Sequence, residues 1–446
     1  MILPLFLALI ALTGVAYILE RRDILSPWVI SCVMFTISAF FALANAQNWG
    51  YSLSPNAVLV ILSGLFAFGL ASILVSVLVE RHSQVKKVVM VKERQDPQKP
   101  FDIPGAALVM IIVLMTGIFL YIFIKTYQFS VEQGNTYGIS QMIKYARQGL
   151  LQPGNNLGRI VGHLNLISEC MQLVFLYIFL HNCLLCVFRK KWLLYLLPIG
   201  IDIAVQTLGT GRIFMINMAS SILIIGFVLY NFRYGWSRQL TLRIIAAGAA
   251  ALLLFFIVFT LLGYLTGKSQ LRSVWDMISI YTGLSIPSLD VFLSSPREEP
   301  SIWGEETLYG LHNILRTLGM DIPVDVRHLE FVSFGEASGN VYTSLRRYIH
   351  DYGFAGMLIV QFLLGVLYSA FYQFIKHKDR AGFSLIIYSW MFYALVMQGI
   401  DEQVLCTMIS TTPVYKLTYL FIIYYSLQYL SRKRTMTVVR KERVCT

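Results

Sequence analysis

The sequence predicts an all-α integral membrane protein, on three grounds: high hydrophobicity, low charge and many long apolar stretches. Of the 446 residues, 57% are hydrophobic and 13% are charged. Soluble globular domains carry about 25% charged residues, so the composition excludes an ordinary soluble protein. Because a spanning helix needs about 20 mostly apolar residues, we expect about 11 transmembrane helices (10–12) in a single polytopic domain over residues 1–446.

The apolar stretches follow one another along the chain, mostly separated by short polar connections. Each is long enough, or nearly long enough, to cross a bilayer. The charged residues 20–23 follow the first stretch, so we expect that stretch to be a retained helix rather than a cleaved signal sequence. The predicted helices cover residues 2–19, 27–46, 55–79, 104–124, 166–187, 192–208, 213–231, 244–266, 352–375, 381–399 and 413–430.

Basic residues favour one side of the predicted helices. Because basic connections stay in the cytoplasm, we expect this side to be cytoplasmic, with the N-terminus outside and the C-terminus inside. The net charge of +12 is then an orientation signal rather than evidence for nucleic-acid binding. This side contains 23 of the 36 Lys and Arg residues, in the connection after residue 20, the cytoplasmic loop 80–103, the connections 189–191, 232–243 and 376–380, and the basic tail 431–446.

Two connections on the predicted outer side, 125–165 and 267–351, are much longer than the others. Loops longer than about 15 residues are usually functional or disordered, and these are rich in aromatic residues and turn signals. In the first, apolar residues recur at helical spacing over 139–150, which predicts a helix on the membrane surface in contact with lipid. In the second, an apolar stretch over 275–293 is broken at Pro287 and is too interrupted to span.

A carboxylate and an arginine lie close to one predicted hairpin of helices. Asp202 falls near the middle of the sixth predicted helix, where an ionisable group is costly and is a functional candidate by default. Arg212 follows Thr210 and Gly211 in the next turn, where glycine permits close backbone approach and a guanidinium suits phosphate recognition. The alternative is structural: Asp202 pairs with an arginine, and Arg212 reaches the lipid headgroups.

The segment 340–353 carries a cation, a base and a carboxylate just before the ninth predicted helix. With Asn340 as the predicted N-cap, and if the segment is helical, Thr343, Arg347, His350 and Asp351 share one face, and Arg346 stands beside them. The alternative is an i,i+4 pair between Arg347 and Asp351, which contributes only a few tenths of a kcal/mol.

Two weaker polar signals lie in the same two outer loops. Glu305 and Glu306 supply either a general base or a solvated acidic turn. Arg147 and Arg159 either hold a phosphate or anchor the surface helix at the headgroups.

Cysteine and histidine positions point to no metal or redox site. Nearly all of the six cysteines lie in or beside apolar stretches, where a thiol packs as a small hydrophobic group, and we interpret the pair Cys183 and Cys186 in the same way. His163, His312 and His328 lack the spacing of metal ligands. We therefore expect no metal.

The order of these short motifs resembles the bacterial oligosaccharide repeat-unit polymerases, the Wzy-type polymerases of O-antigen and capsule. The resemblance covers most of the chain by topology, with a large outer loop between late helices. The residues that carry it are Thr210, Gly211 and Arg212, then Tyr281, Pro287 and Asp290, then Gly304 to Gly310 with Tyr309, then Asn340 to Thr343, Tyr348, Asp351, Gly353 and Gly356.

The resemblance implies a glycosyltransferase of GT-C type architecture in the bacterial cytoplasmic membrane, without a cofactor. Its substrates are oligosaccharide repeat units linked to undecaprenyl diphosphate, joined on the outer face with either inversion or retention. A chain-length regulator and a repeat-unit flippase are the implied partners, and no nucleic acid is expected. The rival interpretations are a glycan ligase that uses the same donor and a lipid-linked oligosaccharide flippase.

The same resemblance suggests roles for the candidate residues. Arginines stabilise the negative charge on the departing diphosphate, and a base takes the proton of the attacking hydroxyl. The diphosphate is assigned to Arg212, Arg346 and Arg347. Either Arg147 or Arg159 is expected to close over it. The candidate bases are His350, Asp351, Glu305 and Glu306. Substrate contacts are assigned to Thr210, Gly211, Asp290 and Asn340, with Tyr281, Tyr309 and Tyr342 stacking on sugar rings or anchoring the chain in the interface.

Overall fold

The computed structural model describes residues 1–87, 99–152, 154–209, 213–236, 273–295, 299–322, 329–378 and 382–444. The predicted helix 244–266 and the motif 210–212 therefore lie outside the described residues. The chain divides into two compact units. Unit 1 comprises Met1–Glu93, Arg272–Asp379 and Met391–Val414, and unit 2 comprises Arg94–Leu271, Arg380–Trp390 and Tyr415–Thr446.

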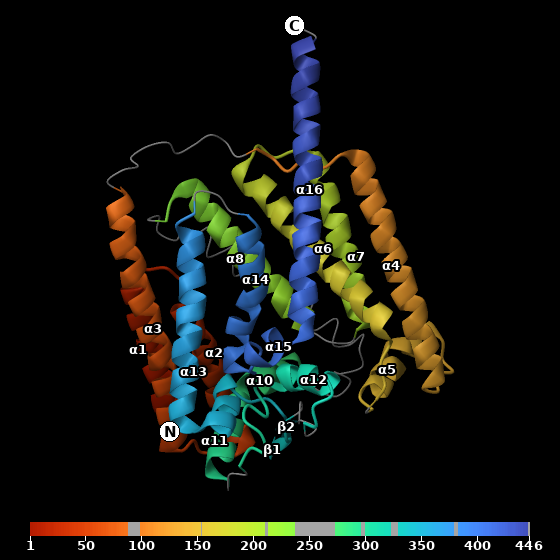
Figure 1. Cartoon of the computed structure of the whole chain (residues 1–446). Helices are drawn as coiled ribbons and strands as arrows, with labels where there is room; N and C mark the ends of the chain where they lie inside the picture. The colour runs from red at the N-terminus through yellow and green to blue at the C-terminus, as the bar shows by residue number, and fades with distance from the viewer. Residues whose placement is uncertain are drawn as a thin grey trace. The chain divides into compact units, whose positions relative to one another are not determined.

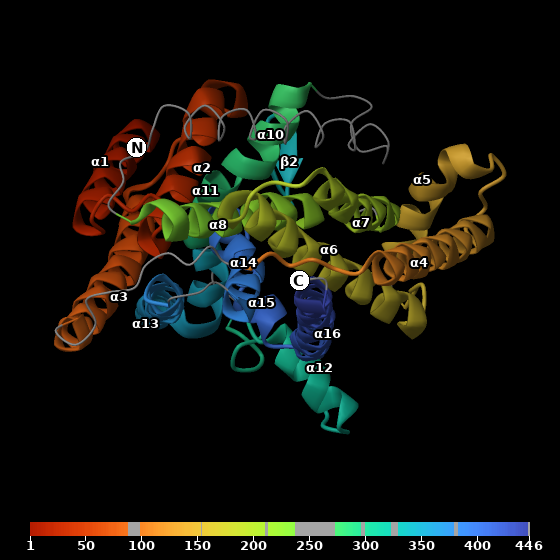
Figure 2. The same ribbon diagram turned by 90° about the horizontal axis from the view of Figure 1, so that it is seen from above.

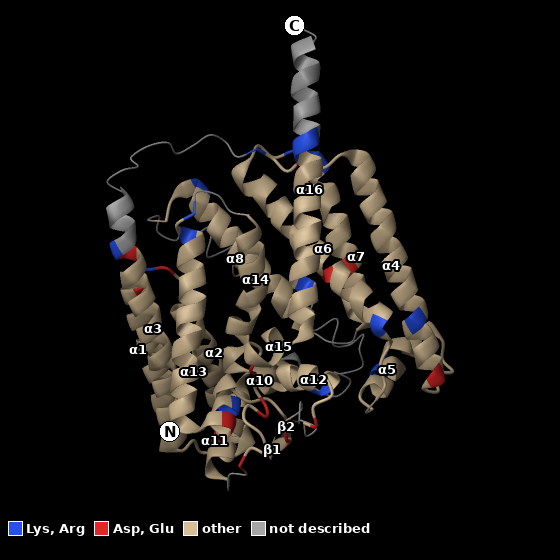
Figure 3. Cartoon of the chain, in the orientation of Figure 1, with Lys and Arg blue, Asp and Glu red and all other residues tan. Residues whose placement is uncertain are grey.

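Helix length and hydropathy indicate a multi-pass membrane protein, as the sequence predicts (Figure 1). Within the described residues, eight helices are long and apolar enough to cross a membrane, or nine if one bent pair of helices counts as a single span. Two further predicted spans form the helices α14 (Phe383–Val396) and α16 (Thr411–Val444), which are not among the eight. In Figure 3, few residues along the middle of the helices have the colours of Lys, Arg, Asp or Glu.

Unit 1 is built on four long helices: α1 (Ile2–Leu19), α2 (Pro27–Trp49), α3 (Pro55–Lys87) and α13 (Ser344–Lys376). The start of α2 follows from its sequence, because Ser26 caps the backbone N–H of Val29 and proline occupies the first helical position. Close packing of α3 and α13 depends on Gly365, where a methyl group would lie 2.5 Å from the backbone oxygen of Phe68. Small residues allow membrane helices to approach in this way.

Helix α13 is divided at Gly353, whose φ of 68° and ψ of −175° are open to glycine almost alone. A short helical segment, 344–352, therefore precedes the long apolar part that the sequence predicts over 352–375. The predicted N-cap Asn340 is wrong, because the helix begins one turn later and Thr343 is the N-cap residue. Several charged residues thus stand on a separate helical segment at the end of a membrane helix.

The connection before α13 is ordered over its described residues. It contains α10 (Val274–Gly283), α11 (Ser285–Ser294), α12 (Tyr309–Thr317) and a hairpin of β1 (Val332–Phe334) with β2 (Ala337–Gly339), in which Val332 pairs with Gly339. α10 and α11 meet at 41°. The predicted break at Pro287 lies instead before Ser285, because Pro287 falls in the first turn of α11, where its missing N–H costs nothing. After α14 come the 3₁₀ turn η2 (Met397–Gly399) and α15 (Leu405–Met408).

Unit 2 contains α4 (Gly105–Glu132), α5 (Ile139–Leu150), α6 (Arg159–Leu185), the 3₁₀ turn η1 (Lys190–Tyr195), α7 (Leu196–Leu208) and α8 (Ile213–Tyr234), with parts of α14 and α16. The predicted amphipathic helix over 139–150 is confirmed as α5, which packs against the end of α4 (Figure 2). Because α4 continues to Glu132 and α6 starts at Arg159, the connection predicted over 125–165 is shorter, 133–158.

Candidate functional site

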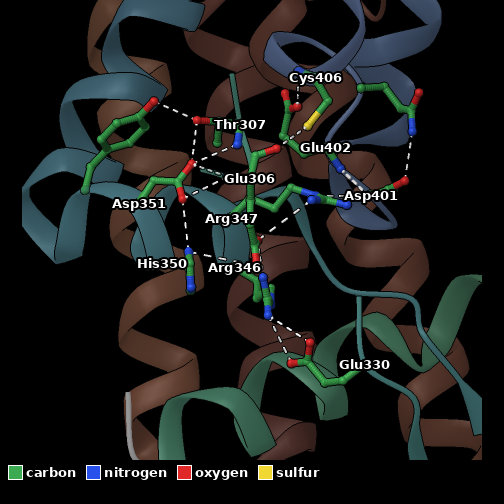
Figure 4. Close-up of polar contacts among 12 residues, drawn as sticks. Glu306, Thr307, Glu330, Arg346, Arg347, His350, Asp351, Asp401, Glu402 and Cys406 are labelled. Carbon is green, nitrogen blue, oxygen red and sulfur yellow. Dashed lines mark hydrogen bonds and ion pairs between the residues drawn. The ribbon is translucent and has the colours of Figure 1, made fainter. Parts of the chain in front are cut away.

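Charged side chains gather at the N-terminal end of α13 within unit 1, and we call this group the α13 cluster (Figure 4). The turn before α12, the segment before β1, the start of α13 and the connection from η2 to α15 supply its members. The cluster consists of Glu306, Thr307, Glu330, Arg346, Arg347, His350, Asp351, Asp401, Glu402 and Cys406.

Arg346 is buried and holds two carboxylates. Its Nη1 group forms an ion pair with Glu306, and its Nη2 group lies 3.0 Å from both carboxylate oxygens of Glu330. Its Cζ atom lies 4.7 Å from the ring centre of Phe292 and 5.2 Å from that of Tyr342, within cation–π range. The Nε–H group finds no hydrogen-bond acceptor among the described residues. Arg346 is therefore held in one place with a donor to spare.

Arg347 lies between carboxylates from two different segments. Its Nη1 atom is 3.8 Å from Glu306 Oε2, and its Nε atom is 3.9 Å from Asp401 Oδ1. These separations are those of ion pairs rather than of hydrogen bonds. Glu306 is thus shared by both arginines, and Arg347 has a second carboxylate beside it.

His350 forms a hydrogen-bonded pair with Asp351 next to Glu306. Its Nδ1 atom lies 3.0 Å from Asp351 Oδ1 and 3.8 Å from Glu306 Oε1. The His350 side chain is 14% exposed, whereas that of Asp351 is fully buried. A histidine that donates Nδ1–H to a carboxylate presents Nε2 as a proton acceptor. This is the arrangement of a general base with an orienting carboxylate.

Asp351 is itself fixed by the turn before α12. Its Oδ2 atom accepts hydrogen bonds from the backbone N–H of Thr307 at 2.8 Å and from the Thr307 hydroxyl at 2.6 Å. The backbone N–H of Glu306 lies 3.2 Å from both Asp351 oxygens. Because Thr307 gives its proton to Asp351, the Tyr352 hydroxyl, 2.6 Å away, donates to Thr307. These donors fix the carboxylate that orients His350.

Glu402 anchors the start of α15. Its carboxylate accepts hydrogen bonds from the backbone N–H groups of Val404, Leu405 and Cys406, each at 2.8 Å. The buried Tyr348 hydroxyl donates to the same carboxylate at 2.9 Å. The first N–H groups of a helix have no partner within the helix, so a carboxylate there is well stabilised. Glu402 thus joins α13 to the connection that carries Asp401.

Two groups at the edge of the cluster have shifted pKa values. Burial alone raises the pKa of Glu330, but its backbone hydrogen bond and the Arg346 guanidinium outweigh burial, so that the pKa lies below its usual range. Burial raises the pKa of the Tyr342 hydroxyl, and the neighbouring Glu330 carboxylate adds to the effect. Glu330 is therefore ionised and Tyr342 neutral at physiological pH.

The structure separates the two adjacent glutamates that the sequence leaves equivalent. Glu306 joins the α13 cluster. Glu305 instead accepts hydrogen bonds from the backbone N–H and hydroxyl of Ser301, both at 3.0 Å, within a local turn. Adjacent side chains in a turn point in different directions, which the sequence alone does not show.

Other predicted site residues of unit 1 lie apart from the cluster or at its edge. Asp290 accepts hydrogen bonds from the backbone N–H of Ser54, at 2.9 Å, and from its hydroxyl, and so ties α11 to the start of α3. Tyr342 packs on Arg346, as described above. Tyr281 is exposed on α10, Tyr309 is half-buried at the start of α12, and Asn340 is half-buried after β2.

The remaining predicted residues belong to unit 2. Arg147 is half-buried on α5, and Arg159 is exposed at the first position of α6. Thr210, Gly211 and Arg212 lie outside the described residues.

Comparison with known proteins identifies no relative. No protein-family model matches the chain, and neither does any curated protein or solved structure. The resemblance to repeat-unit polymerases therefore rests on the short motifs alone, and the chemistry must be argued from the α13 cluster.

Five members of the cluster are missing from the sequence-based candidates: Thr307, Glu330, Asp401, Glu402 and Cys406. The acidic pair Asp401 and Glu402 directly follows a predicted membrane helix, and that position is a usable signal. Glu330 and Cys406 carry no such signal, because only folding brings each of them to its partner. Glu330 meets Arg346, and the Cys406 sulfur lies 3.1 Å from the backbone oxygen of Glu306. Within the described residues, no group of three or more potential ligands is arranged to hold a metal.

Proposed function

We propose that the chain is a glycosyltransferase that polymerises oligosaccharide repeat units linked to undecaprenyl diphosphate. The observation that carries the proposal is the His350–Asp351 pair beside two arginines at the end of a membrane helix. The proposal includes the finer topology of about 11 spans in a GT-C type arrangement. It also places the α13 cluster on the outer face of the bacterial cytoplasmic membrane, with the N-terminus outside and the C-terminus in the cytoplasm.

In this reaction a sugar hydroxyl of one repeat unit attacks the anomeric carbon of another. His350 Nε2 takes the hydroxyl proton as the new C–O bond forms and the bond to the diphosphate breaks. General-base catalysis of this kind is typically worth about 10²–10⁴ in rate. Among the four candidate bases, His350 has the best support, because Asp351 is saturated with hydrogen bonds, Glu306 is paired with arginine, and Glu305 is engaged with Ser301.

The leaving diphosphate needs cations, and the two arginines differ in their suitability. Arg346 is hydrogen-bonded to two glutamates and stacked on aromatic rings, so we assign it a positioning role towards Glu306. Arg347 lies 3.8 Å from the Glu306 carboxylate and 3.9 Å from the Asp401 carboxylate. Replacing one of these carboxylates with a phosphate therefore costs less free energy at Arg347 than at Arg346. A diphosphate would thus take the place of Asp401 or Glu306 beside Arg347.

The test is the glycan profile of a strain in which a variant replaces the native chain. His350→Gln should leave single repeat units on the acceptor, because the hydroxyl loses its base. Glu305→Gln is the matched control, since it changes a neighbouring carboxylate outside the cluster and should give the normal ladder. A normal ladder from His350→Gln protein at normal membrane levels would show that His350 is not the base.

A lipid-linked oligosaccharide flippase is the second candidate, because unit 2 buries an ion pair between Glu169 and Lys416 within its helices. Transporters place ionisable groups inside spans in this way. Deletion separates the candidates: loss of a polymerase leaves single units on the acceptor, and loss of a flippase leaves none. Loss of a ligase also leaves none, but polymer then accumulates on the lipid carrier.

A further inference from the structure

Unit 2 contains a second polar group in the interior of its membrane helices, which we call the Asp202 cluster. Its members are Ser168 and Glu169 of α6, Asp202 and Gln206 of α7, Asn217 of α8, and Lys416 of α16. Asp202 is the midpoint of α7, about 9 Å along the axis from either end of that helix. Its residue surface is 3% exposed.

The only cation of the Asp202 cluster is committed to another acid. Lys416 Nζ forms an ion pair with Glu169, whose Oε1 atom also accepts a hydrogen bond from Asn217 at 2.9 Å. The same Nζ atom lies 5.0 Å from the ring centre of Trp390. Glu169 and Lys416 therefore neutralise each other and leave no net positive charge for Asp202.

Asp202 receives only neutral hydrogen bonds. Ser168 donates to its Oδ1 atom at 2.7 Å, and Gln206 donates to the same atom at 3.1 Å. Within the described part of the chain Asp202 forms no ion pair, and the predicted pairing with an arginine is not found there. An ionised carboxylate without a counter-charge inside a membrane is so costly that the group takes up a proton instead.

We propose that Asp202 is a proton-binding site whose occupancy is controlled by the Glu169–Lys416 pair. In its protonated form, Oδ1 is the hydrogen-bond acceptor and Oδ2 carries the proton. Release of that proton creates a carboxylate that competes with Glu169 for Lys416. The charged groups that act on it are Glu169 on α6 and Lys416 on α16, while α4 and α8 contribute apolar or neutral side chains. This inference does not depend on the proposed function.

The test is labelling of the full-length protein in membranes with dicyclohexylcarbodiimide, an apolar reagent that adds to protonated carboxyls to give an N-acylurea. Mass spectrometry should find the adduct on Asp202 at neutral pH and none on Glu169. Once the pH exceeds the pKa of Asp202, labelling should fall about tenfold per pH unit, in step with the protonated fraction.

Two variants of the Glu169–Lys416 ion pair should have different effects on the labelling of Asp202. Glu169→Gln leaves Lys416 without its partner, so Lys416 should ionise Asp202 and labelling of Asp202 should be lost. Lys416→Met removes the counter-charge from Glu169, so Glu169 should become labelled and Asp202 should stay labelled. A purely structural Asp202 would keep its label in Glu169→Gln.

Infrared spectroscopy gives a second readout that does not need reagent access. A protonated carboxyl band should be present at neutral pH in the native protein and in Ser168→Ala, and should be absent in Asp202→Asn. Absence of both the label and this band from the native protein would overturn the proposal, as would labelling of Glu169 in preference to Asp202.

Discussion

The α13 cluster and the Asp202 cluster both contain acidic and basic side chains inside an apolar chain, but different groups stabilise their carboxylates. In the α13 cluster, Asp351 and Glu402 accept hydrogen bonds from backbone N–H groups of turns and helix starts. In the Asp202 cluster, donors to the acids are side chains, because N–H groups in the middle of a helix are already bonded within it. Charge at a helix end is stabilised by the backbone, and charge within a helix needs another charge or a proton.

The largest effect is expected where a single charge is removed from a pair within the helices. Lys416→Met leaves Glu169 without its cation, and breaking a buried pair costs about 3–5 kcal/mol. Thermal unfolding of the purified protein in detergent measures the loss. The double variant with Glu169→Gln should recover most of it, and a double variant as unstable as Lys416→Met would show that the charge is not the cause.

A smaller effect is expected for Asp351→Asn, because backbone donors surround this carboxylate. The variant loses charge-assisted hydrogen bonds from Thr307 and the charged partner of His350; each such bond contributes about 1.5–3 kcal/mol. The amide NH2 group of asparagine is itself a donor and cannot accept a hydrogen bond from the Thr307 N–H, so the turn before α12 should loosen. Because His350 loses its charged partner, the glycan ladder should shorten. Hydrogen exchange of residues 304–310 measures the first effect. Unchanged exchange would contradict the backbone-anchoring role.

The smallest effect is expected at the exposed rim of the α13 cluster. Glu330 is half-exposed, so its pairing with Arg346 contributes at most about 1 kcal/mol. Because its pKa is lowered on folding, this stability is present above the pKa of the unfolded chain and is lost as the pH falls through the folded value. The stability difference between native protein and Glu330→Gln should therefore start to shrink below about pH 4.3, the pKa of an unfolded glutamate, and should close once the pH is below the folded value. A difference that persists there would show that packing of Tyr342, rather than charge, is responsible.

Hydropathy is enough to predict most of the membrane-spanning helices among the described residues, because a membrane span needs little beyond length and low charge. The sequence also predicts one helical segment that carries Arg346, Arg347, His350 and Asp351, because these residues are close together in the chain. The partners of these residues are not predictable, because Glu306 and Glu305 differ only in direction and Glu330 and Asp401 arrive from distant segments. For the same reason the sequence does not identify the partners of Asp202, which among the described residues are Ser168 and Gln206.

Gly353, with its positive φ, divides α13 into two helical segments joined at one residue. Arg346, Arg347, His350 and Asp351 all belong to the shorter segment. Their mutual spacing is set within that segment, so a change in the backbone angles of Gly353 would leave it intact. Such a change would instead alter the position of these four residues relative to the long apolar part of α13.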